Sequence, residues 1–249
     1  MAENSSIEWT DSTWNPVTGC TKISPGCAHC YAETFAERFR GVDGHPYQQG
    51  FDLKLWPERI DLPLHWKKPR RVFVNSMSDL FHEDVPDDFI GRVFETMQRA
   101  THHTFQVLTK RAERVEQWTN QNFKPASWPS NVWLGVSVEN GDYSWRIEHL
   151  KRTPAKVRFL SIEPLLGPVN LSQKILKGIH WVIVGGESGP KSRRMESEWA
   201  LDIKNQCDKA GIAFFFKQWG AYDQSGVRVG KKTAGRILEA RTWDALPEQ

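Results

Sequence analysis

The sequence has no run of eighteen consecutive apolar residues, which is about the minimum for a membrane-spanning helix. Its first eight residues, MAENSSIE, contain neither the basic segment nor the apolar segment of a secretory signal. It also has no repeat of fixed sequence and no low-complexity stretch. We therefore expect a cytoplasmic protein without a membrane partner.

The chain has little net charge, since 33 Lys and Arg residues face 30 Asp and Glu residues for a formal charge of +3. A charge this small does not by itself imply a polyanionic partner. Apolar residues make up 39% of the 249 residues, enough to bury a full core as one large domain, and an α/β barrel of this length is ordinary. The twelve tryptophans are spread from Trp9 to Trp243, and we expect most of them to be packing residues.

Cysteine is scarce as well, with four in the chain, but Cys20, Cys27 and Cys30 fall together in the spacing C-x6-C-x2-C. In a reducing compartment, close-set cysteines are more often metal ligands or catalytic groups than disulfides. A structural zinc site closes with four ligands, and an ordinary iron–sulfur cluster takes four thiolates. Three cysteines without a near fourth therefore predict a metal site with one open coordination position.

Short β-branched or aromatic runs recur along the chain and predict buried parallel strands. They lie at 71–76, 104–110, 132–138, 157–163, 180–186 and 212–218. Their starts are 23 to 33 residues apart, close to the length of a βαβ unit. The fold class predicted is α/β, with a repeated (β/α) pattern.

Helical spacing of apolar residues predicts helices over 87–101 and 196–210, and a third that begins at the last two cysteines and ends before Gly41. The segment 41–69 shows no period and is expected to be a long inserted loop. Beyond Gly220 polar and apolar residues alternate, with several basic residues among them, which predicts a small β-hairpin. We expect a barrel domain over 1–219 and a hairpin appendage over 220–249.

Polar groups follow nearly every predicted strand, at the end where the loops of a parallel barrel converge on one mouth. They are Asn75, Ser76, Ser78, Asp79, Thr109, Lys110, Arg111, Ser137, Glu139, Asn140, Ser161, Glu163, Gly185, Gly186, Glu187, Ser188, Lys217 and Gln218. Any one of them can belong to an ordinary loop. Polar groups after six successive strands favour a functional site at the mouth of the barrel.

The segment Gly26-Cys-Ala-His-Cys-Tyr-Ala, followed by Leu108-Thr-Lys and Ile162-Glu-Pro-Leu-Leu, resembles the radical S-adenosylmethionine (SAM) superfamily in its spore photoproduct lyase branch. Members carry a three-cysteine loop after the first barrel strand, usually C-x3-C-x2-C with an aromatic residue beside the last cysteine. Here the first gap is six residues. The whole length, including Phe216-Lys-Gln-Trp-Gly, is similar to a phage-associated protein family with a three-cysteine motif.

This resemblance implies a TIM-like partial barrel and a [4Fe–4S] cluster on the three cysteines, with SAM on the fourth iron. A reductant such as flavodoxin or ferredoxin would supply the electron that cleaves SAM to a 5′-deoxyadenosyl radical, and the cofactor would carry the difficult chemistry. Lys110 would meet the SAM carboxylate or a substrate phosphate, and Tyr31 is a candidate radical carrier, as is Tyr47. The remaining residues expected to bind SAM or substrate are Ser76, Ser78 and Asp79 near the SAM amino group, Ser137, Glu139 and Glu163, and the run Gly185, Gly186 and Glu187.

Cys207 suggests a hydrogen donor, because spore photoproduct lyase uses an additional cysteine. Its helical spacing with Trp199 and Ile203 instead predicts a buried structural thiol. A zinc interpretation would recruit His29, His45 or His82 as a fourth ligand, and the spacing singles out none of them.

Basic residues recur in loops at 67–71, 110–111, 191–194 and 231–241, a pattern that suits a phosphate backbone. A solvated surface gives the same pattern, since acidic residues are nearly as numerous. Three functions remain open at this point. They are a radical SAM enzyme acting on a nucleic-acid base or nucleotide in repair or modification, a zinc-stabilised nucleic-acid-binding protein without catalysis, and a barrel that has lost turnover and serves in phage or host interactions.

Overall fold

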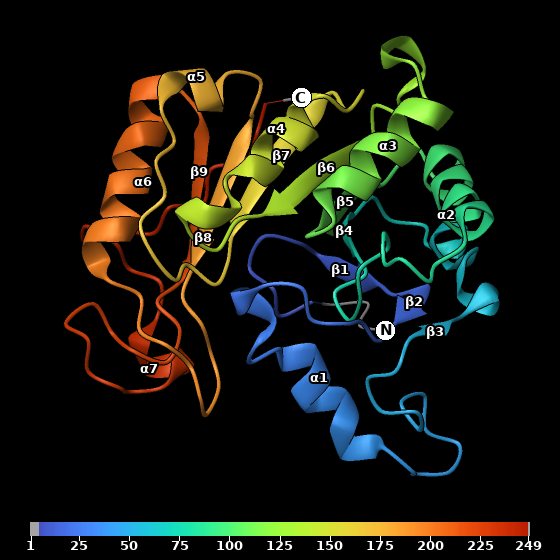
Figure 1. Ribbon diagram of the computed structural model, residues 1–249, viewed down its shortest axis with the longest axis horizontal. Coiled ribbons are helices and arrows are strands. Elements are labelled where there is room, and N and C mark those ends of the chain that lie inside the picture. The colour runs from blue at the N-terminus through green and yellow to red at the C-terminus, as the bar shows by residue number, and fades with distance from the viewer. Residues whose placement is uncertain (1–4, 249) are drawn as a thin grey trace. The chain divides into compact units, whose positions relative to one another are not determined.

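The computed structural model describes residues 5–248, and these divide into two compact units (Figure 1). Among the described residues, unit 1 comprises those up to Leu134 together with Thr153–Lys156, and unit 2 comprises Gly135–Arg152 together with those from Val157 onward. Seven strands form a sheet in the order β1-β4-β5-β6-β7-β8-β9, so that the strand order follows the chain order. This is an α/β fold of the partial TIM-like barrel type, as the sequence predicts.

Unit 1 begins with a short strand, β1, which pairs parallel with β4, and β4 pairs parallel with β5. Its elements are β1 (Ser12–Trp14), β2 (Val17–Thr18), η1 (Pro25–Cys27), α1 (Tyr31–Ala36), η2 (Glu37–Phe39), β3 (Lys54–Leu55), η3 (Pro57–Arg59), η4 (Leu62–His65), β4 (Arg71–Val74), α2 (Asp87–Arg99), β5 (Thr104–Thr109), α3 (Ala112–Asn122) and η5 (Pro125–Ser127). The strand β6 (Val132–Ser137) starts in this unit. The segment 41–69 contains β3, which pairs antiparallel with β2, and two short 3-10 helices.

Unit 2 places β8 between β7 and β9, with both pairs parallel. Its elements are η6 (Gly141–Tyr143), α4 (Trp145–Lys151), β7 (Val157–Ile162), α5 (Gln173–Leu176), β8 (Trp181–Gly185), α6 (Ser197–Ala210), β9 (Ala213–Gln218) and α7 (Lys231–Ala234). Helix α6 packs along β8 and β9 (Figure 1). No helix in the described part of the chain is both long and apolar enough to span a membrane.

The six long strands and the helices α2 and α6 lie where the apolar patterns predict them. Helix α2 buries Phe89, Ile90, Val93, Phe94 and Met97, the positions that its spacing indicates. Helix α6 ends at a glycine with φ +66°, a conformation that glycine adopts without steric cost. Its Cys207 is fully buried, as expected for a structural thiol, and burial raises the pKa of that thiol to about 12.

The C-terminal segment differs from the expected hairpin. Within 220–248 the structure has α7 and isolated antiparallel bridges, such as Tyr222 with Arg228 and Leu238 with Arg241, and no strand. Four glycines, Gly220, Gly226, Gly230 and Gly235, take positive φ there, so the chain turns before a ladder of hydrogen bonds can extend. Polar and apolar residues do alternate in this segment, but they lie in successive turns and not in paired strands.

Candidate functional site

The three cysteines lie in one loop of unit 1, between the first strands of the sheet and α1. Cys20 follows β2, Cys27 ends η1, and Cys30 is the residue just before α1. The six-residue gap between the first two cysteines contains one 3-10 turn, in which the Cys27 amide donates to the Ser24 carbonyl at 2.9 Å. This turn takes up the additional length of the loop, and the last two cysteines stand at the start of α1, as predicted.

All three thiols are free and half-buried, and Cys27 lies near enough to the other two to contribute to the raised pKa of each. Burial raises the pKa of Cys20 to about 11, although Arg111 acts in the opposite direction. Burial also raises the pKa of Cys30, against the amides of Ala32 and Glu33 and the charge of Lys110. Metal binding would require deprotonated thiols and would release their protons.

The start of the cysteine loop is fixed to the segment that follows β4. The Ser78 hydroxyl donates to the Gly19 carbonyl at 2.6 Å, and the Gly19 amide donates to the Met77 carbonyl at 3.1 Å. On the other side, the Cys20 amide donates to the Phe51 carbonyl at 3.2 Å. Ser78, expected to contact SAM, thus holds the backbone just before Cys20.

Ser76 makes a similar connection to the end of β1. The side-chain Nδ2 of Asn15 donates to the Ser76 hydroxyl at 3.2 Å, and the Asn15 side-chain oxygen accepts from the Met77 amide at 3.0 Å. The hydroxyl of Tyr31 donates to the Ser76 carbonyl, while the Tyr31 side chain as a whole remains exposed. The candidate radical carrier therefore lies directly beside Cys30 and against the segment after β4.

We expect Gly19→Ala to lower the free energy of unfolding by more than Gly41→Ala does. The two glycines have nearly the same φ, +81° and +80°, so an added side chain costs about 1–2 kcal/mol of backbone strain at either. At Gly19 the new Cβ would also lie 2.2 Å from the Asp52 carbonyl oxygen, whereas at Gly41 it would meet nothing within 4 Å. Urea denaturation of both variants measures the difference, and equal losses would contradict the close packing at Gly19.

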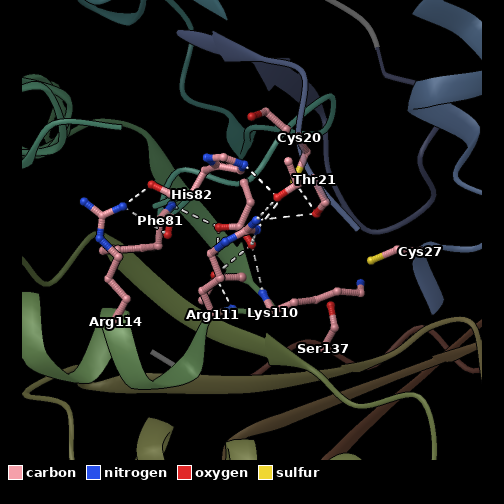
Figure 2. Close-up of polar contacts among 12 residues, drawn as sticks. Cys20, Thr21, Cys27, Phe81, His82, Lys110, Arg111, Arg114 and Ser137 are labelled. Carbon is pink, nitrogen blue, oxygen red and sulfur yellow. Dashed lines mark hydrogen bonds and ion pairs between the residues drawn. The ribbon is translucent and has the colours of Figure 1, made fainter. Parts of the chain in front are cut away.

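Asp79 organises the end of β5. Its carboxylate accepts from the Thr109 hydroxyl at 2.7 Å, the Lys110 amide at 3.1 Å and the Phe81 amide at 2.9 Å, and it pairs with Arg111 at 3.3 Å. These donors fix the strand end that carries Lys110. Figure 2 shows the Lys110 side chain extending in the direction of Cys27.

Arg111 joins this strand end to the cysteine loop. Its guanidinium lies 3.5 Å from the Cys20 sulfur and donates to the Thr21 hydroxyl at 2.9 Å (Figure 2). The sequence identifies Arg111 only as one polar residue among many after the strands. Its position directly after Lys110 was the signal that could have included it in the site.

Two of the three histidines named for a zinc site, His82 and His45, have other partners. The ring of His82 contacts the Thr21 hydroxyl through Nε2 at 2.9 Å and accepts from the Asp84 amide through Nδ1 at 3.2 Å, so both its nitrogens are engaged. His45 accepts from the Tyr47 amide and stacks on Phe39. In the described residues, no three Cys, His, Asp or Glu side chains converge closely enough to hold a single metal ion.

Ligands of one zinc ion must all lie about 2.0–2.3 Å from a single point, whereas each thiolate of a four-iron cluster binds a different iron. Convergence of the side chains on one point is therefore a requirement for a single ion and not for a cluster. The donor set is all sulfur, which is the set that iron–sulfur clusters use.

The other predicted site residues belong to unit 2, where each acidic one forms an ion pair. Glu139 pairs with Arg146 at 2.9 Å, fully buried, and Arg146 also donates to the Ser137 carbonyl at 2.9 Å. The Glu139 carboxylate thus has an internal partner at the end of β6.

Glu163 and Glu187 follow the same pattern at the ends of β7 and β8. Glu163 pairs with Lys217 at 3.1 Å, and Glu187 pairs with Arg193, whose amide donates to it at 2.8 Å. A Cβ at Gly185 would lie 2.4 Å from the Glu163 carboxylate, and one at Gly186 would lie 1.9 Å from the Trp219 carbonyl oxygen. The glycine pair therefore serves close packing against these two neighbours.

The structure thus brings Cys20, Cys27, Cys30, Tyr31, Ser76, Ser78, Asp79 and Lys110 together in unit 1, and it places Ser137, Glu139, Glu163, Gly185, Gly186 and Glu187 in unit 2. Of their basic partners, the sequence analysis missed Arg146 altogether, noted Arg193 only within a basic loop and noted Lys217 only as one of the polar residues after the strands. They lie seven, six and 54 residues from their acids, and spacing alone does not reveal such pairs.

Sequence comparison places residues 4–247 in the family described as "Protein of unknown function (DUF5131)", and the chain belongs to this family. No curated protein matches the sequence. Among solved structures, the fold is similar to "Spore photoproduct lyase complexed with dinucleoside spore photoproduct", with a TM-score of 0.44 and 10% sequence identity. The match covers 78% of this chain and 59% of that chain, so this chain spans about three fifths of that protein's length.

Proposed function

We propose that this protein is a radical SAM enzyme whose [4Fe–4S] cluster is held by Cys20, Cys27 and Cys30. The observation that carries the proposal is the set of three free thiols in one loop after the first parallel strand, without a fourth cysteine beside them. Three thiolates leave one iron open for a substrate-like ligand. The sequence motifs that resemble the superfamily support the same assignment.

When bound, the cluster and SAM supply the electron transfer and the radical chemistry. The chain's own residues hold and shield these groups. The Ser78 and Gly19 bonds fix the position of Cys20, and the amides of Ala32 and Glu33 at the start of α1 face the Cys30 thiol. Lys110, with its backbone held by Asp79, supplies a cation for the SAM carboxylate or a substrate phosphate.

We extend the proposal to a nucleic-acid base or nucleotide as substrate and to a flavodoxin-like or ferredoxin-like electron donor. Support for the substrate comes from exposed lysines at Lys67, Lys68, Lys191 and Lys232. Several of the arginines in the basic loops are already paired, as Arg71 is with Asp11 and Arg236 with Asp244. The lysines therefore carry this part of the proposal.

Anaerobic purification, cluster reconstitution and incubation with SAM and dithionite test the function. We expect about four iron atoms and four sulfides per chain and release of 5′-deoxyadenosine. A variant with alanine at Cys20, Cys27 and Cys30 should lose all three signals. A colourless protein that retains zinc and leaves SAM intact would contradict the proposal and favour a binding role.

A further inference from the structure

We propose that Arg111 is a positioning residue for Cys20 and raises the reduction potential of the cluster. This inference rests on the proposed function and concerns residues of unit 1 alone. It assigns a role to a cation that neither the sequence motifs nor the cysteine spacing place in the site.

Arg111 contacts the cysteine loop at adjacent residues. Its Nη1 atom lies 3.5 Å from the Cys20 sulfur, and its Nη2 atom donates to the Thr21 hydroxyl at 2.9 Å and contacts the Thr21 carbonyl at 3.4 Å. Only 10% of the Arg111 side chain is exposed. A guanidinium is a planar fork with five N–H donors, so it can hold both residues at once.

Arg111 is itself held in place by the carboxylate of Asp79. Asp79, whose side chain is 9% exposed, takes the same Nη1 at 3.3 Å while it accepts from Thr109 and the Lys110 amide. The buried cation is thus paired with a buried carboxylate that is saturated with donors. The ion pair with Asp79 therefore keeps the guanidinium beside the Cys20 sulfur.

Thr21 is held from a second direction by His82. The Asp84 backbone amide is an obligatory donor and it points at Nδ1 of His82, so the proton of this imidazole resides on Nε2. Nε2 therefore donates to the Thr21 hydroxyl, which also accepts from Arg111. Two donors on one oxygen hold the residue next to Cys20 against the ends of β4 and β5.

The other two cysteines have different surroundings. Cys30 faces backbone amides at the start of α1, and the Cys27 sulfur lies 3.7 Å from the Ser24 hydroxyl. Cys20 is the one with a guanidinium at hydrogen-bond distance. When an external reductant adds one electron, the cluster becomes more negative by one charge, and an N–H donor with positive charge on a ligating sulfur stabilises that state. Removing the cation should therefore make the cluster harder to reduce.

The test is a redox titration of the reconstituted protein without SAM, followed by electron paramagnetic resonance. In Arg111→Gln we expect the ratio of reduced to oxidised cluster at a fixed potential to fall at least about tenfold, which for a one-electron step is a shift of about 59 mV. Arg111→Lys keeps the charge and should recover most of the ratio. Arg71→Gln is the matched control, since Arg71 is a partly exposed cation of the same unit that pairs with Asp11 instead of a thiol.

An unchanged potential in Arg111→Gln, with iron content equal to that of the wild type, overturns the inference. If Arg111→Gln assembles no cluster while Arg111→Lys does, with circular dichroism unchanged, the positioning role is supported. If neither Arg111→Gln nor Arg111→Lys assembles a cluster, the positive charge of Arg111 is not the basis of its effect, and the inference is overturned. A wild-type protein that assembles no cluster would instead refute the proposed function, so the two failures are distinct.

Discussion

Replacing any one of Cys20, Cys27 and Cys30 by serine is expected to abolish stable cluster binding, while Cys207→Ala retains it. A cluster held by three protein thiolates has none to spare, because its fourth iron is left for SAM. Loss of a residue that merely orients a metal ligand already costs about 10–100-fold in affinity, and loss of a ligand should exceed that. Iron and sulfide analysis of the four single variants, reconstituted in parallel, measures the effect.

Cys207 is a suitable control because it is the fourth cysteine of the chain and lies fully buried on α6 in unit 2. Cys207→Ala removes a buried sulfur and is expected to cost stability only. Full cluster content in Cys27→Ser, or loss of the cluster in Cys207→Ala with the fold intact, would contradict the assignment of the ligands.

The largest effect on stability is expected from Arg146→Ala. Glu139 and Arg146 have side chains that are 0% and 2% exposed and form an ion pair of 2.9 Å. Removing the arginine leaves a buried carboxylate without its cation, which costs about 3–5 kcal/mol. It also removes the guanidinium that lies 4.5 Å from the Tyr143 ring centre. Urea denaturation followed by circular dichroism measures the loss.

Arg194→Ala is the matched control for this experiment. Its pair with Glu196 has the same 2.9 Å distance, but the two side chains are 45% and 37% exposed, and an exposed pair is worth about 0–1 kcal/mol. The double variant Glu139→Leu with Arg146→Met should recover most of the stability, because it replaces both charges with apolar groups. Similar losses in Arg146→Ala and Arg194→Ala would show that burial does not decide the contribution of these pairs.

The sheet could be predicted from the sequence wherever a strand is long and buried on both faces. The runs that became β4 to β9 are continuous and apolar, and a parallel sheet requires such runs. Strand β1, with three residues, is too short to show a period, and it is the sheet strand that precedes the cysteine loop. The expected hairpin after Gly220 was wrong because alternation of residues does not distinguish a ladder from a series of glycine turns.

The sequence predicts the candidate ligands but not the residues that hold them in place. Thiol spacing indicates a metal site because few other roles use three close cysteines in one loop. The contacts that hold Cys20 come from Ser78 and Arg111, which are 58 and 91 residues away in sequence. Such long-range pairings depend on how the strands align, and no local pattern in the chain encodes them.

The burial of Cys207 also makes the protein's own thiols a convenient reporter. Cys207 is fully buried, whereas the three loop cysteines are partly exposed, so a reagent in solution reaches the loop thiols and does not reach Cys207. An alkylating reagent applied to the folded protein should therefore label the cysteine loop alone. Mass spectrometry would then show up to three adducts per chain in the empty protein and none when the three sulfurs are coordinated, which measures occupancy molecule by molecule without metal analysis.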